Sequence, residues 1–443
     1  MLKKQFLIFF TFLTVSLSFC MPFSVSAYEI TEFEITAKAG MLVSLDTGEI
    51  LFEKNIDEKI YPASITKIMT AILMLESDKY NPDGKVVMTQ EILDMVLGTG
   101  LSVSLMKAGE EFTQYDLLHL VMVASYGDST YLAAQYYGGT VDNFVSMMNQ
   151  KAKELGLTAT NFTNPVGLHD DNHYTTVRDI YTLTSYALKN EEFREVCDKS
   201  RYKFSTNYTE NRTLSTTNFL LDNTTNYYYS LAHGIKTGFT DEAGRCLVSI
   251  AYPENKEYTY LCILMGCPNS SAKSYQFSES AQLYRWAFNN FSYKEIANST
   301  EPVCEIPVEL SLETDFVPLH FKEPFLSILP NDADESTIVV KPELNSESCE
   351  APVKKGQVLG KAEIYYAEKL IGTVDLVAGS DVKASKILIA AKYIKNFFTS
   401  SYMKILLVVI ILAILIFIIM CIHLNMSKIR KRRKKYIPYK EKK

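Results

Sequence analysis

An apolar run near the carboxyl end constrains this chain more than any other part of its sequence. Residues 405–424 read ILLVVIILAILIFIIMCIHL. At about 1.5 Å of rise per residue, a helix of this length matches the roughly 30 Å hydrocarbon core of a bilayer. The length and the basic residues that follow disfavour a buried core helix. We therefore predict a transmembrane helix over residues 404–424.

The two ends of the chain predict its orientation in the membrane. The tail, residues 425–443, holds ten Lys or Arg residues against one acid, Glu441. The positive-inside rule places this tail in the cytoplasm and the chain before Tyr402 outside. Residues 1–27 combine Lys3 and Lys4, an apolar run and the small-residue pattern Val25-Ser26-Ala27. This pattern predicts a secretory signal peptide, and hence a single-pass protein whose main part is extracytoplasmic.

The charge balance of the outer part excludes one class of partner. Between residues 28 and 403 the chain has 32 basic and 50 acidic residues, a net charge near −18. Because nucleic-acid binding depends on the neutralisation of phosphates, we predict no nucleic-acid partner.

Six cysteines lie between the two apolar ends. An extracytoplasmic location permits disulfides, and a Cys304–Cys349 bridge is one hypothesis. No Cys-x-x-Cys spacing or Cys/His cluster indicates a metal site, and the six histidines are scattered. We predict no metal and no cofactor, and assign no histidine to catalysis.

The 443 residues suggest two or three domains. Residues 39–54 predict two strands around an Asp46-Thr47-Gly48 turn. A helix is predicted from about Ser64, just after Pro62. Helical stretches fill the middle of the chain, and strands follow at about 245–251 and 258–265. Antiparallel strands from both ends with helices between them indicate an α/β sandwich rather than a doubly wound fold, which we assign to residues 28–295.

The texture of the sequence changes after Asn298. Alternating apolar and polar residues, as in EPVCEIPVELSLETDFVPLHF, predict a small all-β domain over residues 298–384. Residues 385–403 are expected to form a helical stalk that leads to the membrane.

The first chemical motif is Ser64-Ile65-Thr66-Lys67. Residues three apart on a helix share a face, so Lys67 can bring its amine to the Ser64 hydroxyl. The S-x-x-K spacing occurs six times in the chain and is weak by itself. Ser64 differs from the others because it follows Pro62-Ala63 at the mouth of a predicted helix, where free backbone N–H groups can bind an oxyanion.

The second motif, Lys236-Thr237-Gly238, occurs once and precedes the strand predicted from Arg245. A cation and a hydroxyl there could line one edge of a cleft, and Gly238 would let a substrate backbone approach closely.

Together these motifs resemble the signature of the low-molecular-mass D-alanyl-D-alanine carboxypeptidases among the penicillin-binding proteins. The resemblance rests on Tyr61–Ile68, on Asn164-Pro165-Val166-Gly167-Leu168 with the nearby His173–Thr176, and on Gly234–Gly238. It covers residues from about 38 to 290, and the following β-rich segment also resembles the second domain of the family. It implies the antiparallel α/β sandwich of the penicillin-binding-protein and β-lactamase type.

The resemblance also implies an activity and roles for residues. Ser64 would attack the bond between two D-alanines, and Lys67, kept neutral by burial and by Lys236, would take its proton. Ser125 would pass a proton to the leaving amine. Lys236 and Thr237, with Gly238 beside them, would hold the terminal carboxylate, and the N–H groups of Ser64 and Phe239 would form the oxyanion hole. The implied substrate is the pentapeptide of peptidoglycan, and β-lactams would be inhibitors.

Two places depart from the family pattern. Where the family has Ser-x-Asn, this chain has Ser125-Tyr126-Gly127, which removes a carboxamide that steadies the substrate. An alternative is that Ser125 merely caps the next helix. An arginine that many relatives use for the substrate carboxylate is also missing, since Cys267-Pro268-Asn269 stand in its place.

Three other functions share part of this pattern. A β-lactamase of class A needs a glutamate on the central loop, but no Glu lies between Leu155 and Asn190. A non-catalytic penicillin-fold binding protein is suggested by Gly127. An endopeptidase that cuts peptide cross-links would use the same catalytic residues.

Overall fold

The computed structural model describes residues 34–255 and 258–434. The predicted signal peptide, residues 1–27, lies outside the described residues. The chain divides into two compact units. The first contains the described residues up to Lys294 together with Leu326–Asp334, and the second contains Glu295–Phe325 and the chain from Glu335 onward. Leu326–Asp334 thus folds with the first unit, although its neighbours in sequence fold with the second.

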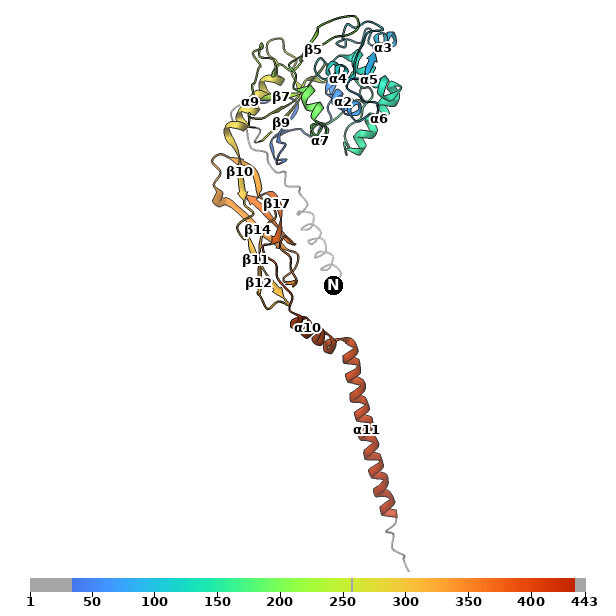
Figure 1. Cartoon of the computed structure of the whole chain (residues 1–443), viewed down its shortest axis with the longest axis vertical. Helices are drawn as coiled ribbons and strands as arrows, with labels where there is room; N and C mark the ends of the chain where they lie inside the picture. The colour runs from blue at the N-terminus through green and yellow to red at the C-terminus, as the bar shows by residue number, and fades with distance from the viewer. Residues whose placement is uncertain (1–33, 256–257, 435–443) are drawn as a thin grey trace, which may run out of the picture. The chain divides into compact units, whose positions relative to one another are not determined.

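The first unit is built on a five-stranded antiparallel sheet with the strand order β2-β1-β9-β8-β7. Figure 1 labels β7 and β9 of this sheet. The chain enters this sheet twice, first as a hairpin and later as a three-strand meander. The strands are β1 (Ala39–Ser44), β2 (Ile50–Lys54), β7 (Ala232–Thr240), β8 (Gly244–Ala251) and β9 (Tyr260–Cys267). The predicted hairpin around Asp46-Thr47-Gly48 is confirmed, and so is the α/β sandwich with strands from both ends.

Helices cover both faces of this sheet, and the central strand β9 shows why. Every residue of β9 is buried. Because side chains alternate along a strand, Leu261 and Ile263 belong to one apolar core while Cys262 and Leu264 belong to another. A single helix, α9 (Tyr275–Asn290), packs into the second core.

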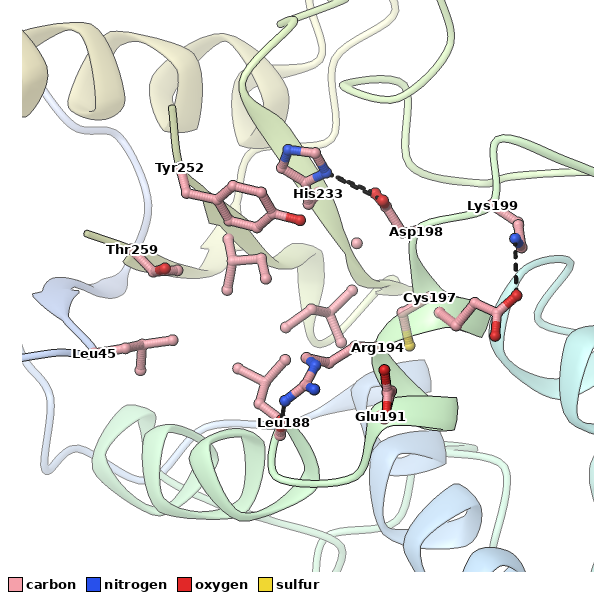
Figure 2. A pocket seen from close by; sticks show the side chains of 14 residues that line it. Leu45, Leu188, Glu191, Arg194, Cys197, Asp198, Lys199, His233, Tyr252 and Thr259 are labelled. Carbon is pink, nitrogen blue, oxygen red and sulfur yellow. Dashed lines mark hydrogen bonds and ion pairs between the residues drawn. The ribbon is translucent and has the colours of Figure 1, made fainter. Parts of the chain in front are cut away.

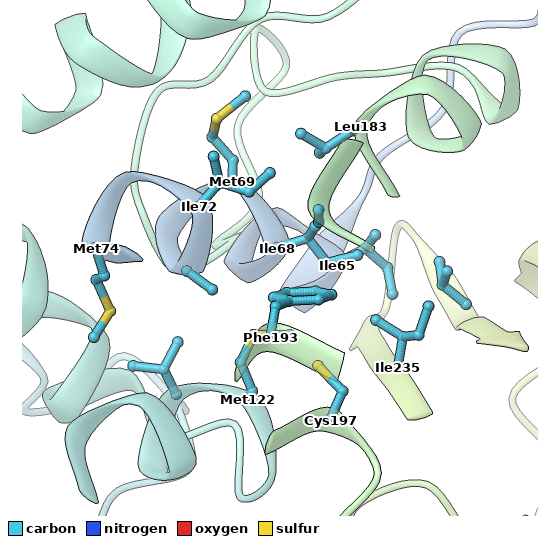
Figure 3. Packing of buried hydrophobic residues seen from close by; sticks show 14 of the residues in the cluster. Ile65, Ile68, Met69, Ile72, Met74, Met122, Leu183, Phe193, Cys197 and Ile235 are labelled. Carbon is cyan, nitrogen blue, oxygen red and sulfur yellow. The ribbon is translucent and has the colours of Figure 1, made fainter. Parts of the chain in front are cut away.

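The first core is filled by the helices from the middle of the chain. They are α2 (Lys67–Leu75), α3 (Gln90–Met95), α4 (Gln114–Met122), α5 (Gly127–Gly138), α6 (Val141–Glu154), α7 (Val177–Ala187) and α8 (Glu191–Cys197). Residues Lys67 to Met74 of α2 are all buried, so this helix is apolar all round and lies inside the core. Figure 3 shows Ile68 of α2, Phe193 of α8 and Ile235 of β7 converging there.

Two predictions about local structure need correction. The helix predicted from Ser64 begins as a 3-10 turn, η1 (Ala63–Thr66), and becomes α-helical only at Lys67. The Lys236-Thr237-Gly238 motif was placed before a strand, but it lies within strand β7 itself. The polar residues of the motif break the apolar pattern that indicates a buried strand. Among the described residues, β7 is an edge strand of the sheet.

The described residues also form three two-stranded sheets. They pair β3 (Lys85–Val87) with β4 (Glu111–Thr113), β5 (Arg201–Phe204) with β6 (Arg212–Ser215), and β10 (Phe291–Ala297) with β13 (Phe325–Pro330).

The second unit contains a six-stranded sheet with the order β14-β16-β17-β12-β11-β15. Its strands are β11 (Cys304–Glu309), β12 (Phe316–Phe321), β14 (Ile338–Leu344), β15 (Cys349–Glu350), β16 (Val358–Tyr366) and β17 (Lys369–Ala378). A 3-10 turn, η2 (Glu335–Thr337), precedes β14. Alternate residues such as Ile306, Leu319, Ile364 and Leu376 form a separate apolar core, as the alternating pattern of this segment predicted.

The hypothesis of a Cys304–Cys349 bridge is wrong. Cys349 pairs with Val308 in the parallel ladder between β11 and β15. Val308 lies four residues from Cys304, about 13 Å along the strand, whereas bridged cysteines have Cα atoms within about 7 Å. Both residues are free thiols.

Two helices end the second unit. The expected stalk contains α10 (Lys386–Thr399), which is followed by α11 (Ser401–Lys434). Residues Ser401–Arg430 of α11 are long and apolar enough to cross a membrane by length and composition. The helix extends beyond the predicted span of 404–424 at both ends and includes basic residues of the tail, because nothing in LNMSKIRKRRK interrupts a helix.

The buried carboxylate of Glu279 allows a test of what holds the segment before β1 against α9. Glu279 of α9, which is 1% exposed, accepts hydrogen bonds from the Thr36 N–H (2.9 Å), the Thr36 hydroxyl (2.6 Å) and the Ala37 N–H (3.3 Å). Glu279→Ala leaves these donors unpaired and is expected to lower the free energy of unfolding by about 1–3 kcal/mol. Glu279→Gln keeps an acceptor oxygen and should lose less.

Denaturant unfolding measures both variants, and Glu58→Ala, at an exposed position, is the control. Equal stabilities for Glu279→Ala and Glu58→Ala would show that this contact does not hold the segment before β1 onto α9.

Candidate active site

The Ser64 and Lys67 side chains meet where η1 becomes α2. Lys67 Nζ lies 2.8 Å from Ser64 Oγ and donates a second hydrogen bond to the Val166 carbonyl oxygen at 2.9 Å. The 3-10 turn places the serine one turn before the lysine on the same face of the helix. The predicted nucleophile and base are therefore in direct contact.

The electrostatics at Lys67 favour a neutral amine. The side chain is fully buried, and burial lowers its pKa well below the usual range, with the charge of Lys236 as a further cause. Lys236 is itself 1% exposed, and burial lowers its pKa to about 7. A neutral Lys67 amine can accept the proton of the Ser64 hydroxyl that it contacts.

The central loop Asn164–Leu168 holds the lysine from the other side. Thr70 of α2 donates its hydroxyl to the Pro165 carbonyl at 2.9 Å, one residue before the carbonyl that contacts Lys67. Asn164 Oδ1 shapes the loop by accepting three backbone N–H groups, from Val166, Gly167 and Leu168. The loop thus supplies a backbone acceptor to the amine.

Gly167 makes this approach possible. Its φ is +88°, and a Cβ there would lie 1.9 Å from the Ala63 carbonyl oxygen. Only glycine fits so close to the residue before Ser64.

His173 fastens the same loop to the helix. The Thr163 N–H donates to His173 Nδ1 at 3.0 Å, so Nε2 carries the proton and donates to Thr66 Oγ1 at 2.8 Å. The ring is 2% exposed, and burial lowers its pKa to about 4. His173 therefore has a structural part in the site, because it links the central loop to η1.

Strand β7 forms the opposite wall of the site. A Cβ added at Gly238 would lie 3.1 Å from both the Ser64 nitrogen and the Pro62 carbonyl oxygen, so the strand passes directly against η1. The Thr237 hydroxyl donates to the Thr217 hydroxyl at 2.6 Å. Phe239, one residue further, is 38% exposed. Lys236, Thr237, Gly238 and Phe239 thus line one edge next to the nucleophile.

Ser125 lies in the short segment between α4 and α5. The Thr217 N–H donates to the Val123 carbonyl at 3.2 Å, while the Thr217 hydroxyl contacts Thr237. This bridge brings the end of α4 and strand β7 together. The alternative that Ser125 caps the following helix is wrong, because the N-cap is Tyr126 and no side chain caps α5. Ser125 has φ +61°, a conformation that costs energy in most residues and that clusters at functional sites.

Gly127 is tightly covered by Leu101. A Cβ at Gly127 would lie 2.7 Å from Leu101 Cδ1 and 2.9 Å from its Cβ. The loop that carries Leu101 is fixed: Gly127 N–H donates to the Ser102 carbonyl at 2.7 Å, and the buried Asp128 accepts from the Ser104 N–H and hydroxyl. Leu101 thus occupies the space that a side chain at position 127 would need.

A cavity of about 720 Å³ lies apart from these groups (Figure 2). It is lined by residues from α8 and the first half of β7, including His233, which stacks on Tyr252 and is hydrogen-bonded to Asp198. Neither Ser64 nor Lys67 lines it. Cys197, on its wall, lies next to Lys236, whose charge opposes the raised pKa of the buried thiol. The contact between Ser64 and Lys67 makes their position, and not this cavity, the candidate active site.

Sequence reasoning missed two residues of the site, Leu101 and Thr217, and named Val166 only as part of the Asn164–Leu168 motif, without a role. Leu101 and Thr217 reach the site from loops, and no local pattern marks them. Among the residues that the structure describes, no group of three or more His, Cys, Asp or Glu side chains could hold a metal ion.

Comparisons with known proteins agree with this geometry. Residues 24–267 match the Peptidase S11 family, described as D-alanyl-D-alanine carboxypeptidase, and residues 291–384 match the family described as penicillin-binding protein 5, C-terminal domain. The chain is 30% identical to the D-alanyl-D-alanine carboxypeptidase DacA of Haemophilus influenzae over 86% of this chain and 94% of that protein. It is 29% identical to DacF of Bacillus subtilis over 80% and 87%.

Solved structures show the same likeness. Penicillin-binding protein 5 from Haemophilus influenzae superposes with a TM-score of 0.64 at 29% identity, covering 80% of this chain and 100% of that one. The Streptomyces K15 DD-transpeptidase superposes with a TM-score of 0.54 at 30% identity, covering 59% and 100%.

The contact between Gly127 and Leu101 can be tested by restoring the family residue. Gly127→Asn is expected to destabilise the protein by about 1–3 kcal/mol, because its Cβ overlaps Leu101. In a Leu101→Gly background the same change should cost less. Thermal unfolding of the four proteins in this cycle measures the coupling.

The control is Ser102→Asn, at an exposed position next to Leu101. If Gly127→Asn costs the same with and without the Leu101 side chain, then Leu101 does not exclude the asparagine.

The buried histidines predict a pH dependence of stability. Burial lowers the pKa of His173, and likewise that of His119, from 6.5 to about 4. Between pH 6.5 and 4 the unfolded chain binds protons that the folded chain does not, so the free energy of unfolding falls as pH falls. Each histidine contributes up to about 3 kcal/mol across this window. His173→Gln, which can still donate to Thr66 but does not titrate, should remove about half of this loss. Unfolding midpoints at several pH values provide the measurement, and an unchanged slope would contradict it.

Proposed function

Because the chain belongs to the Peptidase S11 family of D-alanyl-D-alanine carboxypeptidases, we propose that it releases the terminal D-alanine from peptides ending in D-Ala-D-Ala, with Ser64 as nucleophile. The observation that carries the proposal is the contact of 2.8 Å between Ser64 Oγ and the buried amine of Lys67. The pentapeptide of peptidoglycan is the proposed substrate.

In the first step, neutral Lys67 takes the proton of the Ser64 hydroxyl, and Oγ attacks the carbonyl carbon between the two D-alanines. The negative charge that develops on the carbonyl oxygen is stabilised by the N–H groups of Ser64 and Phe239. The close passage of β7 against η1, measured at Gly238, supports this pair of donors.

In the second step, the C–N bond breaks and the leaving D-alanine takes a proton at its nitrogen. Ser125 passes this proton from Lys67 to the amine. The Val123–Thr217–Thr237 contacts support this role, since they draw the Ser125 loop to β7. The acyl group remains on Ser64 as an ester.

In the third step, water loses a proton to neutral Lys67 and adds to the ester carbonyl. The Ser64–acyl bond then breaks, and the serine regains its proton. The shortened peptide leaves as a carboxylic acid, so atoms and charges balance over the cycle. A β-lactam would acylate the same serine by opening its ring, and the family therefore predicts inhibition by these compounds.

The carboxylate of the substrate would bind beside Lys236 and the Thr237 hydroxyl. Burial lowers the pKa of Lys236 to about 7, and an anion next to it favours its charged form. Substrate binding therefore supplies a partner for this buried cation.

The location of the site follows from the ends of the chain. We propose that α11 crosses the cell membrane once, with the ten basic residues of the tail in the cytoplasm and the catalytic unit outside. This places Ser64 on the side where peptidoglycan is built.

The proposal predicts that activity depends on Ser64 alone among the serines of S-x-x-K motifs. The purified full-length chain in detergent should release D-alanine from an acyl-D-Ala-D-Ala peptide and should be labelled by a fluorescent penicillin. Ser64→Ala should lower both rates by at least about 10³-fold while the fold is retained. Ser380→Ala is the matched control, because it has the same spacing to Lys383 but belongs to the second unit.

Each other outcome identifies an alternative. Labelling without release of D-alanine, but with cleavage of a cross-linked dimeric peptide, identifies an endopeptidase. Rapid turnover of the penicillin identifies a β-lactamase. Folded protein with neither labelling nor release contradicts the proposal and identifies a non-catalytic binding protein.

A further inference from the structure

The cavity beside α8 and the first half of β7 has the size and the lining of a small-molecule site. Its volume of about 720 Å³ lies within the range of roughly 300–1,000 Å³ that such sites have. Leu45, Leu188 and Ile250 give it apolar walls, and charged side chains enter it from α8 and from the segment that follows. Figure 2 shows the rings of His233 and Tyr252 on the side opposite to α8. The cavity can therefore enclose a ligand that has both apolar and charged parts.

Four of the polar side chains that line the cavity have partners within the protein. Lys199 Nζ donates to Glu195 Oε1 at 3.1 Å, and His233 Nδ1 donates to the Asp198 carboxylate at 3.0 Å. The His233 ring also stacks on Tyr252, with ring centres 3.8 Å apart. Figure 2 draws both polar contacts. These side chains build the cavity wall and engage one another.

Two further charges of α8, those of Arg194 and Glu191, line the cavity without a charged partner in the described part of the chain. Arg194 Nη1 donates at 2.6 Å to the Leu188 carbonyl oxygen, which is a neutral acceptor. The Glu191 carboxylate forms no hydrogen bond or ion pair with a described residue. Residues three apart on a helix are neighbours, with Cβ atoms about 5–6 Å apart. The cavity thus presents one cation and one anion close together.

The Tyr252 hydroxyl adds a polar group near the guanidinium. Burial and the negative charge of Asp198 raise the pKa of Tyr252, while the positive charge of Arg194 opposes this shift. Arg194 therefore lies close enough to act electrostatically on the Tyr252 side chain across the cavity. A guanidinium and a hydroxyl together are donors that suit a carboxylate.

A ligand that matches both charges of α8 carries an ammonium group as well as a carboxylate. A ligand with a single charge would cover the other charge without pairing it, and a desolvated, unpaired charge costs free energy. The two ends of an extended dipeptide lie about 7 Å apart, a separation that two long side chains on neighbouring turns can reach. The side chains of such a peptide would also contact the apolar walls.

We propose that this cavity binds a short zwitterionic peptide of two or three residues, with its carboxylate on Arg194 and the Tyr252 hydroxyl and its ammonium group on Glu191. The apolar side chains of the peptide lie against the apolar walls. Neither Ser64 nor Lys67 lines the cavity, so this site is independent of the function proposed for Ser64.

The test compares three forms of one dipeptide, L-alanyl-L-leucine: the free peptide, its N-acetyl derivative and its C-terminal amide. None of them ends in D-alanine, so the proposed catalytic site does not compete for them. Calorimetric titration of the full-length protein in detergent should show binding of the free peptide. Blocking either end removes one charge-assisted contact, and we expect the Kd to rise about 10- to 100-fold.

Two variants assign the contacts to the two charges of α8. Arg194→Met should bind the free peptide and its amide equally weakly, and Glu191→Gln should bind the free peptide and its N-acetyl derivative equally weakly. Both positions are exposed, and unfolding midpoints check that the fold is retained. Arg201→Met and Glu58→Gln are matched controls at exposed positions that do not line the cavity, and both should bind as the wild type does.

Three results would overturn the inference. The first is the absence of any heat of binding with the free peptide up to about 10 mM. The second is an equal Kd for the free and the blocked peptides, which would show that the charged ends are not recognised. The third is unchanged discrimination in both Arg194→Met and Glu191→Gln, which would place the peptide elsewhere on the protein.

Discussion

The burial of one amine is the constraint on which the first unit depends. Lys67 begins a helix that is buried on all sides, so its side chain has no access to bulk water. A charged amine in such a place is costly, and the nearby Lys236 adds repulsion, so the neutral form is favoured. A base that is neutral and held 2.8 Å from a hydroxyl is what acyl transfer to a serine requires. The apolar core thus favours the neutral form of Lys67 that the proposed mechanism requires.

Several features of the surrounding backbone follow from this buried amine. Its N–H groups need acceptors, and the loop around Val166 provides a carbonyl that water cannot provide. That carbonyl can approach only because Gly167 has no side chain, and the loop stays in place because His173 and Asn164 bind it at several points. The central loop of this protein therefore holds the base in position, while a class A β-lactamase uses a glutamate there.

The sequence predicted the parts of this arrangement that depend on local spacing. Three residues of a helical turn connect Ser64 to Lys67, and the alternation of apolar residues identified the sandwich and the second, all-β unit. The sequence did not predict contacts made between distant segments. Leu101 covers Gly127, and Arg245 reaches Asn269, through tertiary contacts that no periodicity records. Strand β7 was missed for a related reason, since the polar residues of a catalytic edge break the pattern of a buried strand.

The two buried lysines also connect substrate binding to the state of the base. With no anion beside it, Lys236 has a pKa of about 7 and is only partly charged in neutral solution. A carboxylate bound next to Lys236 favours its charged form, and a charged Lys236 in turn lowers the pKa of Lys67. Protonation of Lys236 thus makes protonation of Lys67 less favourable. In the proposed mechanism, a substrate carboxylate next to Lys236 therefore reinforces the neutral state of Lys67 that burial already favours.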